Sequence, residues 1–191
     1  MSFLNPIVTF LNRGGQLKLI GFILGLSWIG TLLLFLFPDV IFYGALFPRE
    51  TFGLFGIITG PLLHYGLLHI LANSVSFLIL GAVVSAELQG RFPRFLLVAY
   101  LFNGALLWVF GRASFHLGLS GVIFSLLGFL LMNSVVSKQG SILGLLLVLG
   151  IFVSDIIKDG FALGSIQSWE GHLVGLFVGV CLAVVLKKRV I

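Results

Sequence analysis

Two polar side chains in strongly apolar surroundings have the chemistry to act together on a substrate. Ser120 lies in the run Gly-Leu-Ser-Gly at 118–121, where a hydrophobic segment begins, and His172 lies in a second apolar segment further along the chain. A serine hydroxyl and an imidazole are the two parts needed to make and use a nucleophile. A glycine-flanked serine alone is more often a packing motif in a glycine-rich helix. A histidine within an apolar span is costly to bury, and it is a functional hypothesis by default.

The composition indicates that this chemistry would take place inside a lipid bilayer. Hydrophobic residues make up 59% of the chain and charged residues 9%, and the mean hydropathy is +1.21. Apolar stretches of about 17–25 residues, the length that crosses a bilayer as a helix, recur along the sequence. The single cysteine, Cys181, is expected to be a small packing residue. No metal-ligand spacing is present, so neither a metal nor a cofactor is expected.

The apolar stretches predict an all-α, polytopic membrane protein with six transmembrane helices in a single domain over 1–191. The spans are expected at 19–37, 62–83, 94–111, 119–136, 141–157 and 169–186. They are helices rather than barrel strands because they lack a two-residue alternation. Between Pro38 and Pro61 aromatic residues are interrupted by glycines and prolines, which predicts a partly embedded first loop. The first residues lack a basic start and a small-residue cleavage site, so no signal peptide is expected.

Basic residues predict the orientation of these spans. With the N-terminus in the cytoplasm, three of the 11 Lys and Arg side chains fall outside, namely Arg49, Arg112 and Lys158, and the others fall inside. Both termini are therefore expected in the cytoplasm, in a multi-pass protein of a bacterial inner membrane or a plasma membrane. The net charge of +5 is then explained by inner-face contacts with anionic lipid. No basic stripe supports binding to nucleic acid.

In this orientation, three predicted helices enter from the outer face with polar residues near their starts. These residues are His64, His69 and Asn73 on the second helix, Ser120 on the fourth and His172 on the sixth. His69 and Asn73 are four apart and share a helix face, whereas His64, five residues before His69, is expected to point elsewhere and to lie nearer the loop.

Small residues predict that the fourth and sixth helices pack closely. Ridges at four-residue spacing run along both, through Gly171, Gly175 and Gly179 on the sixth and through Gly121 and Ser125 on the fourth. Close packing there would bring His172 to Ser120. If His172 removes the Ser120 proton, the oxyanion formed on attack needs donors, which the Ser120 N–H at a helix N-terminus and the side chains of His69 and Asn73 can supply.

Other polar residues are expected to have structural roles. Glu170 is two residues from His172 and points to another face, so a Ser-His dyad is favoured over a triad. His116 is expected to be a solvated loop residue and Asn103 to make an interhelical hydrogen bond. The remaining expectation is an inner-face ion cluster of Glu87 with Arg91 and Arg94.

These residues resemble the motifs of the rhomboid family of intramembrane serine proteases, over about Thr59 to Gly179. The matches are His64-x4-His69-x3-Asn73, Gly118-Leu119-Ser120-Gly121 and His172-x2-Gly175-x3-Gly179, and Glu87 fits a family acidic position. The resemblance implies six helices around a water-filled cavity, with Ser120 as the nucleophile and His172 as the general base. It also implies that His69 and Asn73 help to hold the oxyanion, with His64 and Gly118 as secondary site residues.

The chain departs from the family pattern in its first loop. Many members have Trp-Arg where this chain reads Phe55-Gly56, so their loop-anchoring contacts are not expected here. The family also implies that substrate enters sideways between the second and fifth helices. Phe152 and Ile156, four apart on the fifth helix, are either the gate or a lipid-facing pair.

The expected activity is that of a serine endopeptidase that cuts transmembrane protein substrates near the outer membrane face. One alternative is a small membrane transporter, which the lack of internal repeats disfavours. The other is a catalytically silent rhomboid-like protein that binds membrane segments. The presence of both Ser120 and His172 argues against that alternative.

Overall fold

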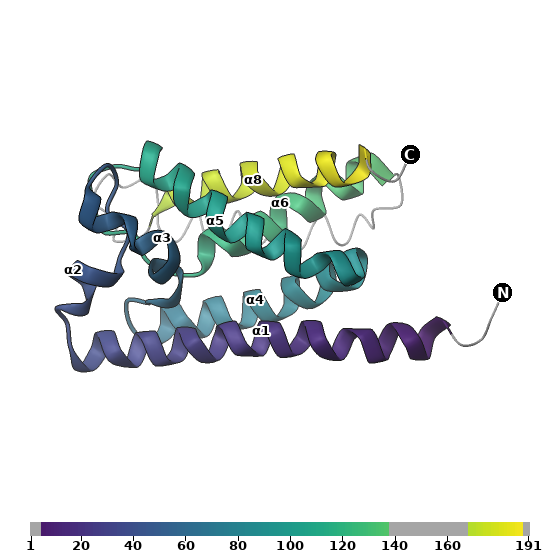
Figure 1. Cartoon of the computed structure of the whole chain (residues 1–191), viewed down its shortest axis with the longest axis horizontal. Helices are drawn as coiled ribbons and strands as arrows, with labels where there is room; N and C mark the ends of the chain where they lie inside the picture. The colour runs from purple at the N-terminus through teal and green to yellow at the C-terminus, as the bar shows by residue number, and fades with distance from the viewer. Residues whose placement is uncertain (1–4, 138–167, 189–191) are drawn as a thin grey trace.

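Long helices lie side by side along the long axis of the molecule (Figure 1). The computed structural model describes residues 5–137 and 168–188. Its long helices are α1 (Asn5–Leu36), α4 (Leu67–Leu88), α5 (Phe92–Phe110), α6 (Ser120–Ser137) and α8 (Trp169–Lys188). The described residues contain no β-strand beyond one isolated bridge between Leu46 and His116. The predicted all-α fold is confirmed.

The long helices agree with the predicted spans except at two starts. α1 begins at Asn5 rather than at residue 19. α4 begins at Leu67 rather than at residue 62, because a short 3-10 helix, η2 (Gly60–Leu62), precedes it and Gly66 has a φ of +86°. By length and composition Gly14–Leu36, Leu67–Phe110 and Trp169–Leu186 can cross a membrane, and Ser120–Val135 is a shorter apolar helix. The predicted helix at 141–157, with Phe152 and Ile156, lies outside the described residues.

The segment between α1 and α4 forms short helices that cannot span. They are α2 (Val40–Gly44), η1 (Thr51–Leu54), α3 (Gly56–Thr59) and η2. Figure 1 places α2 and α3 at the end of the bundle where α1 ends and α8 begins. Tyr43 is 77% exposed and Phe55 63% exposed, so the segment presents aromatic surface. Its place in a bilayer stays a prediction.

Residues at the end of α5 hold this first loop in place. The Arg49 guanidinium donates from Nη1 to the carbonyls of Val109 at 3.1 Å and Gly111 at 2.6 Å. Trp108 Nε1 donates to the Glu50 carbonyl at 3.1 Å. At Gly56 the chain crosses so close to the backbone of residues 45–46 that a Cβ would collide with it. The first loop is therefore anchored through Arg49 and Trp108, while glycine at position 56 allows the chain to pass close to the backbone of residues 45–46.

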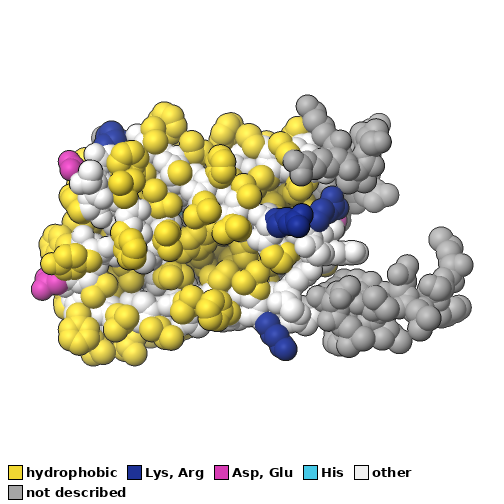
Figure 2. All heavy atoms as spheres, in the orientation of Figure 1, with side chains coloured by type: hydrophobic (Ala, Val, Ile, Leu, Met, Phe, Trp, Pro, Cys, Tyr) yellow, Lys and Arg dark blue, Asp and Glu magenta, His cyan; other side chains and the backbone are white. Residues whose placement is uncertain are grey.

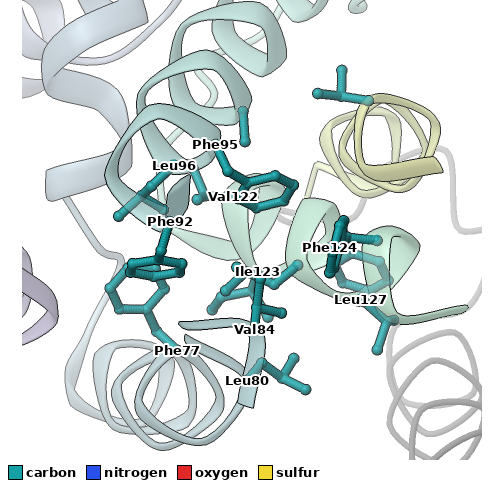
Figure 3. Packing of buried hydrophobic residues seen from close by; sticks show 14 of the residues in the cluster. Phe77, Leu80, Val84, Phe92, Phe95, Leu96, Val122, Ile123, Phe124 and Leu127 are labelled. Atoms are coloured by element: carbon teal, nitrogen blue, oxygen red, sulfur yellow. The ribbon is translucent and has the colours of Figure 1, made fainter. Parts of the chain in front are cut away.

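α6 lies at the centre of the bundle, and its side chains form much of the core. Residues 121–129 are all buried. Figure 3 shows core side chains of three helices in contact: Phe77, Leu80 and Val84 of α4, Phe92, Phe95 and Leu96 of α5, and Val122, Ile123, Phe124 and Leu127 of α6. Burial of this apolar surface fixes α6, and with it Ser120 at its first position, among its neighbours.

The outer surface is apolar around the middle of the bundle. Figure 2 shows hydrophobic side chains over most of the visible face, with Lys and Arg gathered mainly toward the end where α1 begins and α8 ends. Leu68 is 84% exposed, Phe35 80% and Phe110 71%. A contiguous apolar surface of this kind is rare on soluble monomers and marks contact with lipid or protein.

Two expectations about single side chains are wrong. Cys181 is exposed rather than packed. It lies two positions after Gly179, which faces α6, so its side chain points to the other side of α8. Glu87 is exposed and forms no ion pair with Arg91 or Arg94. α4 ends at Leu88 and Gln89 has a φ of +50°, so the helical register that would bring these charges together is broken.

The predicted glycine contact between α6 and α8 is confirmed. A Cβ added at Gly175 would collide with the Gly121 carbonyl, and one at Gly179 with the Ser125 carbonyl. In the opposite direction, a Cβ at Gly128 would collide with the Leu176 carbonyl. Because backbone atoms oppose each glycine, the two helices approach more closely than any larger side chain would allow.

We expect Gly175→Ala to lower the stability of the fold by about 1–3 kcal/mol, because the added methyl group must push the two helix backbones apart. Gly25→Ala in α1 is the matched control, since a Cβ there meets nothing within 4 Å and alanine is the better helix former. Thermal unfolding of the purified proteins in detergent measures both. If Gly175→Ala and Gly25→Ala lowered the melting temperature equally, or if neither lowered it, the close contact would be contradicted.

Candidate active site

The structure brings Ser120 and His172 into contact. Ser120 Oγ and His172 Nε2 are 3.0 Å apart, although the residues are 52 positions apart in the sequence. Ser120 is the first residue of α6 and His172 lies in the first turn of α8. Both are partly buried. The distance is within the range needed for proton transfer between a nucleophile and a general base.

Phe124 fixes the plane of the His172 ring. The two rings are stacked, with centroids 4.3 Å apart and planes inclined by 10°. Phe124 lies four residues after Ser120 and therefore on the same face of α6. Phe124 is a site residue that could not be predicted from the sequence. Its spacing from Ser120 was the available signal, but a phenylalanine in an apolar helix is indistinguishable by type from an ordinary core residue.

His69 and Asn73 lie beside Gly118, just before the serine. A Cβ added at Gly118 would lie 2.9 Å from His69 Nε2 and 3.5 Å from Asn73 Nδ2. Gly118 also has a φ of +109°, which residues with side chains rarely adopt. The predicted common face of His69 and Asn73 is therefore turned toward the Gly-Leu-Ser-Gly turn, and glycine at 118 leaves room for both.

Asn73 carries a hydrogen-bond donor that no described residue uses. It is 8% exposed, and its buried Nδ2 has no hydrogen-bond partner among the residues that the structure describes. Buried donors without partners are rare and call for an explanation. A donor held beside the serine turn, without a partner in the part of the chain that the structure describes, is available to a substrate atom.

His64 links three parts of the chain. Thr31 Oγ1 donates to the Ser27 carbonyl at 2.7 Å, so His64 Nδ1, 3.3 Å away, donates to Thr31 Oγ1. His64 Nε2 then accepts the Leu119 N–H at 3.2 Å. Burial, reinforced by the nearby His69, lowers the pKa of His64 to about 3, which keeps the ring neutral. His64 thus ties α1 to the backbone next to Ser120.

The expectation that His64 points away from His69 is wrong. Their rings are in edge contact, with centroids 5.0 Å apart. The expectation assumed that both residues lie on one helix, but α4 begins only at Leu67 and the chain turns at Gly66. Helical spacing therefore does not govern the direction of His64.

The expectation that His116 is solvated is also wrong. His116 is 3% exposed because its backbone pairs with Leu46, which draws the residue under the first loop. Its Nδ1 is 2.7 Å from Ser168 Oγ and its Nε2 is 3.0 Å from the Arg112 carbonyl oxygen. Burial lowers the pKa of the ring below its ordinary value.

Two further polar residues join the site helices. Asn103 makes the predicted interhelical hydrogen bond, since its Nδ2 donates to the Gly171 carbonyl at 3.1 Å. Glu170 pairs with Arg112, and the Arg112 Nε lies 3.3 Å from the Glu170 Oε1.

A cavity of about 30 Å³ adjoins Ser120 and is bordered by Gly118, Gly121 and Gly171 among other residues. The described part of the chain holds no group of three or more His, Cys, Asp or Glu side chains arranged to bind a metal.

Comparisons with known proteins agree with the motifs. Residues 51–189 match the family model of the rhomboid domain. Uncharacterized proteins of Mycobacterium bovis and Mycobacterium tuberculosis are 32% identical over 153 residues, which cover 73% of this chain and 62% of each relative. One from Mycobacterium leprae is 32% identical over 143 residues, or 70% of this chain and 56% of the relative.

The chain spans about three fifths of the length of these curated relatives. The family match extends from the first loop through α8 and includes every helix that carries Ser120, His172, His69 or Asn73. With its long apolar helices, the chain is an integral membrane protein, and it belongs to the rhomboid family.

Proposed function

We propose that this protein is an intramembrane serine protease that cleaves transmembrane protein substrates with a Ser120–His172 dyad. The observation that carries the proposal is the 3.0 Å contact between Ser120 Oγ and His172 Nε2. His172 takes the serine proton as Oγ attacks the scissile carbonyl, and it then gives that proton to the leaving amine. A water molecule, activated by the same imidazole, hydrolyses the acyl-enzyme. These steps require no cofactor.

The oxyanion of each tetrahedral intermediate is stabilised by donors on two helices. Asn73 Nδ2 is buried and has no hydrogen-bond partner among the described residues, which suits a group that hydrogen-bonds only to the reacting oxygen. His69 lies beside the same glycine, and the N–H of Ser120 opens α6, where the helix dipole favours negative charge. Donors held in place before the reaction lose no free energy to reorganisation when the charge develops.

The substrate is a transmembrane helix cut near its outer end. The first residues of α4, α6 and α8 lie at one end of the bundle, and the start of α1 and the end of α8 lie at the other (Figure 1). With Lys and Arg toward that second end, the termini belong in the cytoplasm and the site at the outer face, in a bacterial inner membrane or a plasma membrane. Glycines border the cavity beside Ser120, which favours small substrate residues, and helix-breaking residues nearby would free the scissile bond from its helical hydrogen bonds.

We expect a fluorophosphonate probe to label the parent protein at Ser120, because a serine activated by an adjacent base reacts with such probes as it does with a carbonyl. Ser120→Ala should not be labelled, and Ser76→Ala in α4 should be labelled like the parent. Gel fluorescence and mass spectrometry of the labelled peptide give the result. Equal labelling of the parent and Ser120→Ala would contradict a nucleophilic Ser120. An unlabelled but folded parent would favour a catalytically silent family member that binds membrane segments.

A further inference from the structure

Two side-chain pairs join the loop before the serine to the first turn of α8. The loop, residues 111–119, ends in the glycine turn that leads to Ser120, and the first turn of α8 carries His172. One pair is His116 with Ser168, and the other is Arg112 with Glu170. We name these two pairs the loop–helix clasp. It connects the two segments that carry the proposed nucleophile and base.

Ser168 bonds to both segments through one hydroxyl group. It immediately precedes α8, and its Oγ accepts the Gly171 N–H at 3.1 Å, as an N-cap residue does. His116 Nε2 faces a carbonyl oxygen, that of Arg112, so it carries the proton and Nδ1 is the acceptor. The Ser168 hydroxyl, 2.7 Å away, therefore donates to Nδ1 of a neutral His116. The same oxygen holds the helix start and the loop.

The charged pair reinforces this connection. Arg112 Nε and Glu170 Oε1 are 3.3 Å apart, and the two side chains are 28% and 11% exposed. Glu170 also lies in the first turn of α8, where a negative charge is favoured by the helix dipole. Both pairs thus hold the turn that contains His172. Ser168 does so as its N-cap, and Glu170 does so through its side chain.

We propose that His116 and Ser168 are positioning residues for the reaction described above, and the proposal rests on that proposed function. They hold the start of α8 against the loop so that His172 Nε2 stays at 3.0 Å from Ser120 Oγ. A general base must lie within about 2.6–3.2 Å of the proton donor, and a misplacement of about 1 Å can cost about 100-fold in rate. Neither residue touches the reacting atoms.

Variants of Ser168 separate this role from general support of the fold. Ser168→Ala should lower kcat about tenfold and leave KM nearly unchanged, because loss of the hydrogen bonds to His116 and from the Gly171 N–H loosens the base without altering where substrate binds. Ser168→Thr keeps the hydroxyl and should restore most of the rate. Ser114→Ala, in the same loop and without a hydrogen bond in the described structure, is the matched control. His116→Asn, whose amide oxygen can accept from Ser168, should retain more activity than His116→Ala.

A double-mutant cycle tests whether the pair acts as one unit. If it does, His116→Ala with Ser168→Ala should lower kcat no more than Ser168→Ala alone, which already removes the shared hydrogen bond together with the cap on the Gly171 N–H. Fold-losses of kcat that multiply in the double variant, or a Ser168→Ala rate equal to that of Ser114→Ala, would overturn the proposal. So would a Ser168→Ala variant in which kcat falls only in proportion to the folded fraction, measured by thermal unfolding in the same detergent.

Hydrogen exchange distinguishes failure of the clasp from failure of the proteolytic function. Amides of residues 169–172 should exchange faster in Ser168→Ala than in Ser114→Ala, whether or not the protein has activity. Faster exchange together with a lower kcat supports the positioning role. Unchanged exchange shows that the clasp does not hold α8, and faster exchange with parental kcat shows that it does not position the base. If the parent is folded but neither cleaves nor reacts with fluorophosphonate, the proposed function fails, and the positioning role fails with it.

Discussion

Replacement of Ser120 or His172 by alanine is expected to lower the cleavage rate of a transmembrane substrate by more than about 1000-fold, and the double variant should be no slower than either single one. The two groups are 3.0 Å apart and perform one step together, so removing either one removes the whole function of the pair. Initial rates on a purified single-span substrate in detergent measure the loss.

These variants should remain folded, because each substitution only shortens a partly buried side chain. Thermal unfolding checks this, and Ser76→Ala, one turn after Asn73 in α4, serves as a serine control outside the dyad. A Ser120→Ala variant that cleaves at the parental rate would refute the dyad. Multiplying effects in the double variant would indicate that Ser120 and His172 act in separate steps.

Asn73→Ala is expected to lower kcat by about 10–1000-fold with little change in KM. Its Nδ2 has no partner among the described residues, so the hydrogen bond it can offer is made to the substrate oxygen as charge develops, which affects the transition state rather than substrate binding. Steady-state kinetics over a range of substrate concentrations separates the two parameters.

His64→Ala is the comparison for Asn73→Ala. His64 hydrogen-bonds to Thr31 and the Leu119 N–H and touches the His69 ring, but it is not itself proposed as an oxyanion donor. We therefore expect a lower melting temperature and a smaller loss of kcat than for Asn73→Ala. Equal losses of kcat at equal stability would show that the oxyanion donors have been assigned to the wrong side chains.

The features that could be predicted from the sequence depend on local rules. Apolar length gave the described long helices, and four-residue spacing placed His69 and Asn73 on one face of α4, beside Gly118. The glycine ridges predicted the close contact of α6 and α8, because only small residues permit such an approach. That contact explains why Ser120 and His172 meet.

The features that could not be predicted depend on irregular backbone or on contacts between distant residues. The direction of the His64 side chain follows from the turn at Gly66. Because His64 lies before this turn and outside α4, helical spacing does not predict where its side chain points. The burial of His116 follows from backbone pairing with Leu46, a residue far away in the sequence. The anchoring of the first loop by Arg49 likewise involves carbonyls at the far end of α5, which carry no sequence signal.

The most direct test of the central claim is cleavage of a single-span substrate by the purified protein in liposomes, with the products identified by mass spectrometry. We expect one cut near the outer end of the substrate helix, next to a small residue, with the parent protein and none with Ser120→Ala. A folded parent that leaves the substrate intact, or a Ser120→Ala variant that gives the same product, would contradict the assignment of this protein as an intramembrane serine protease.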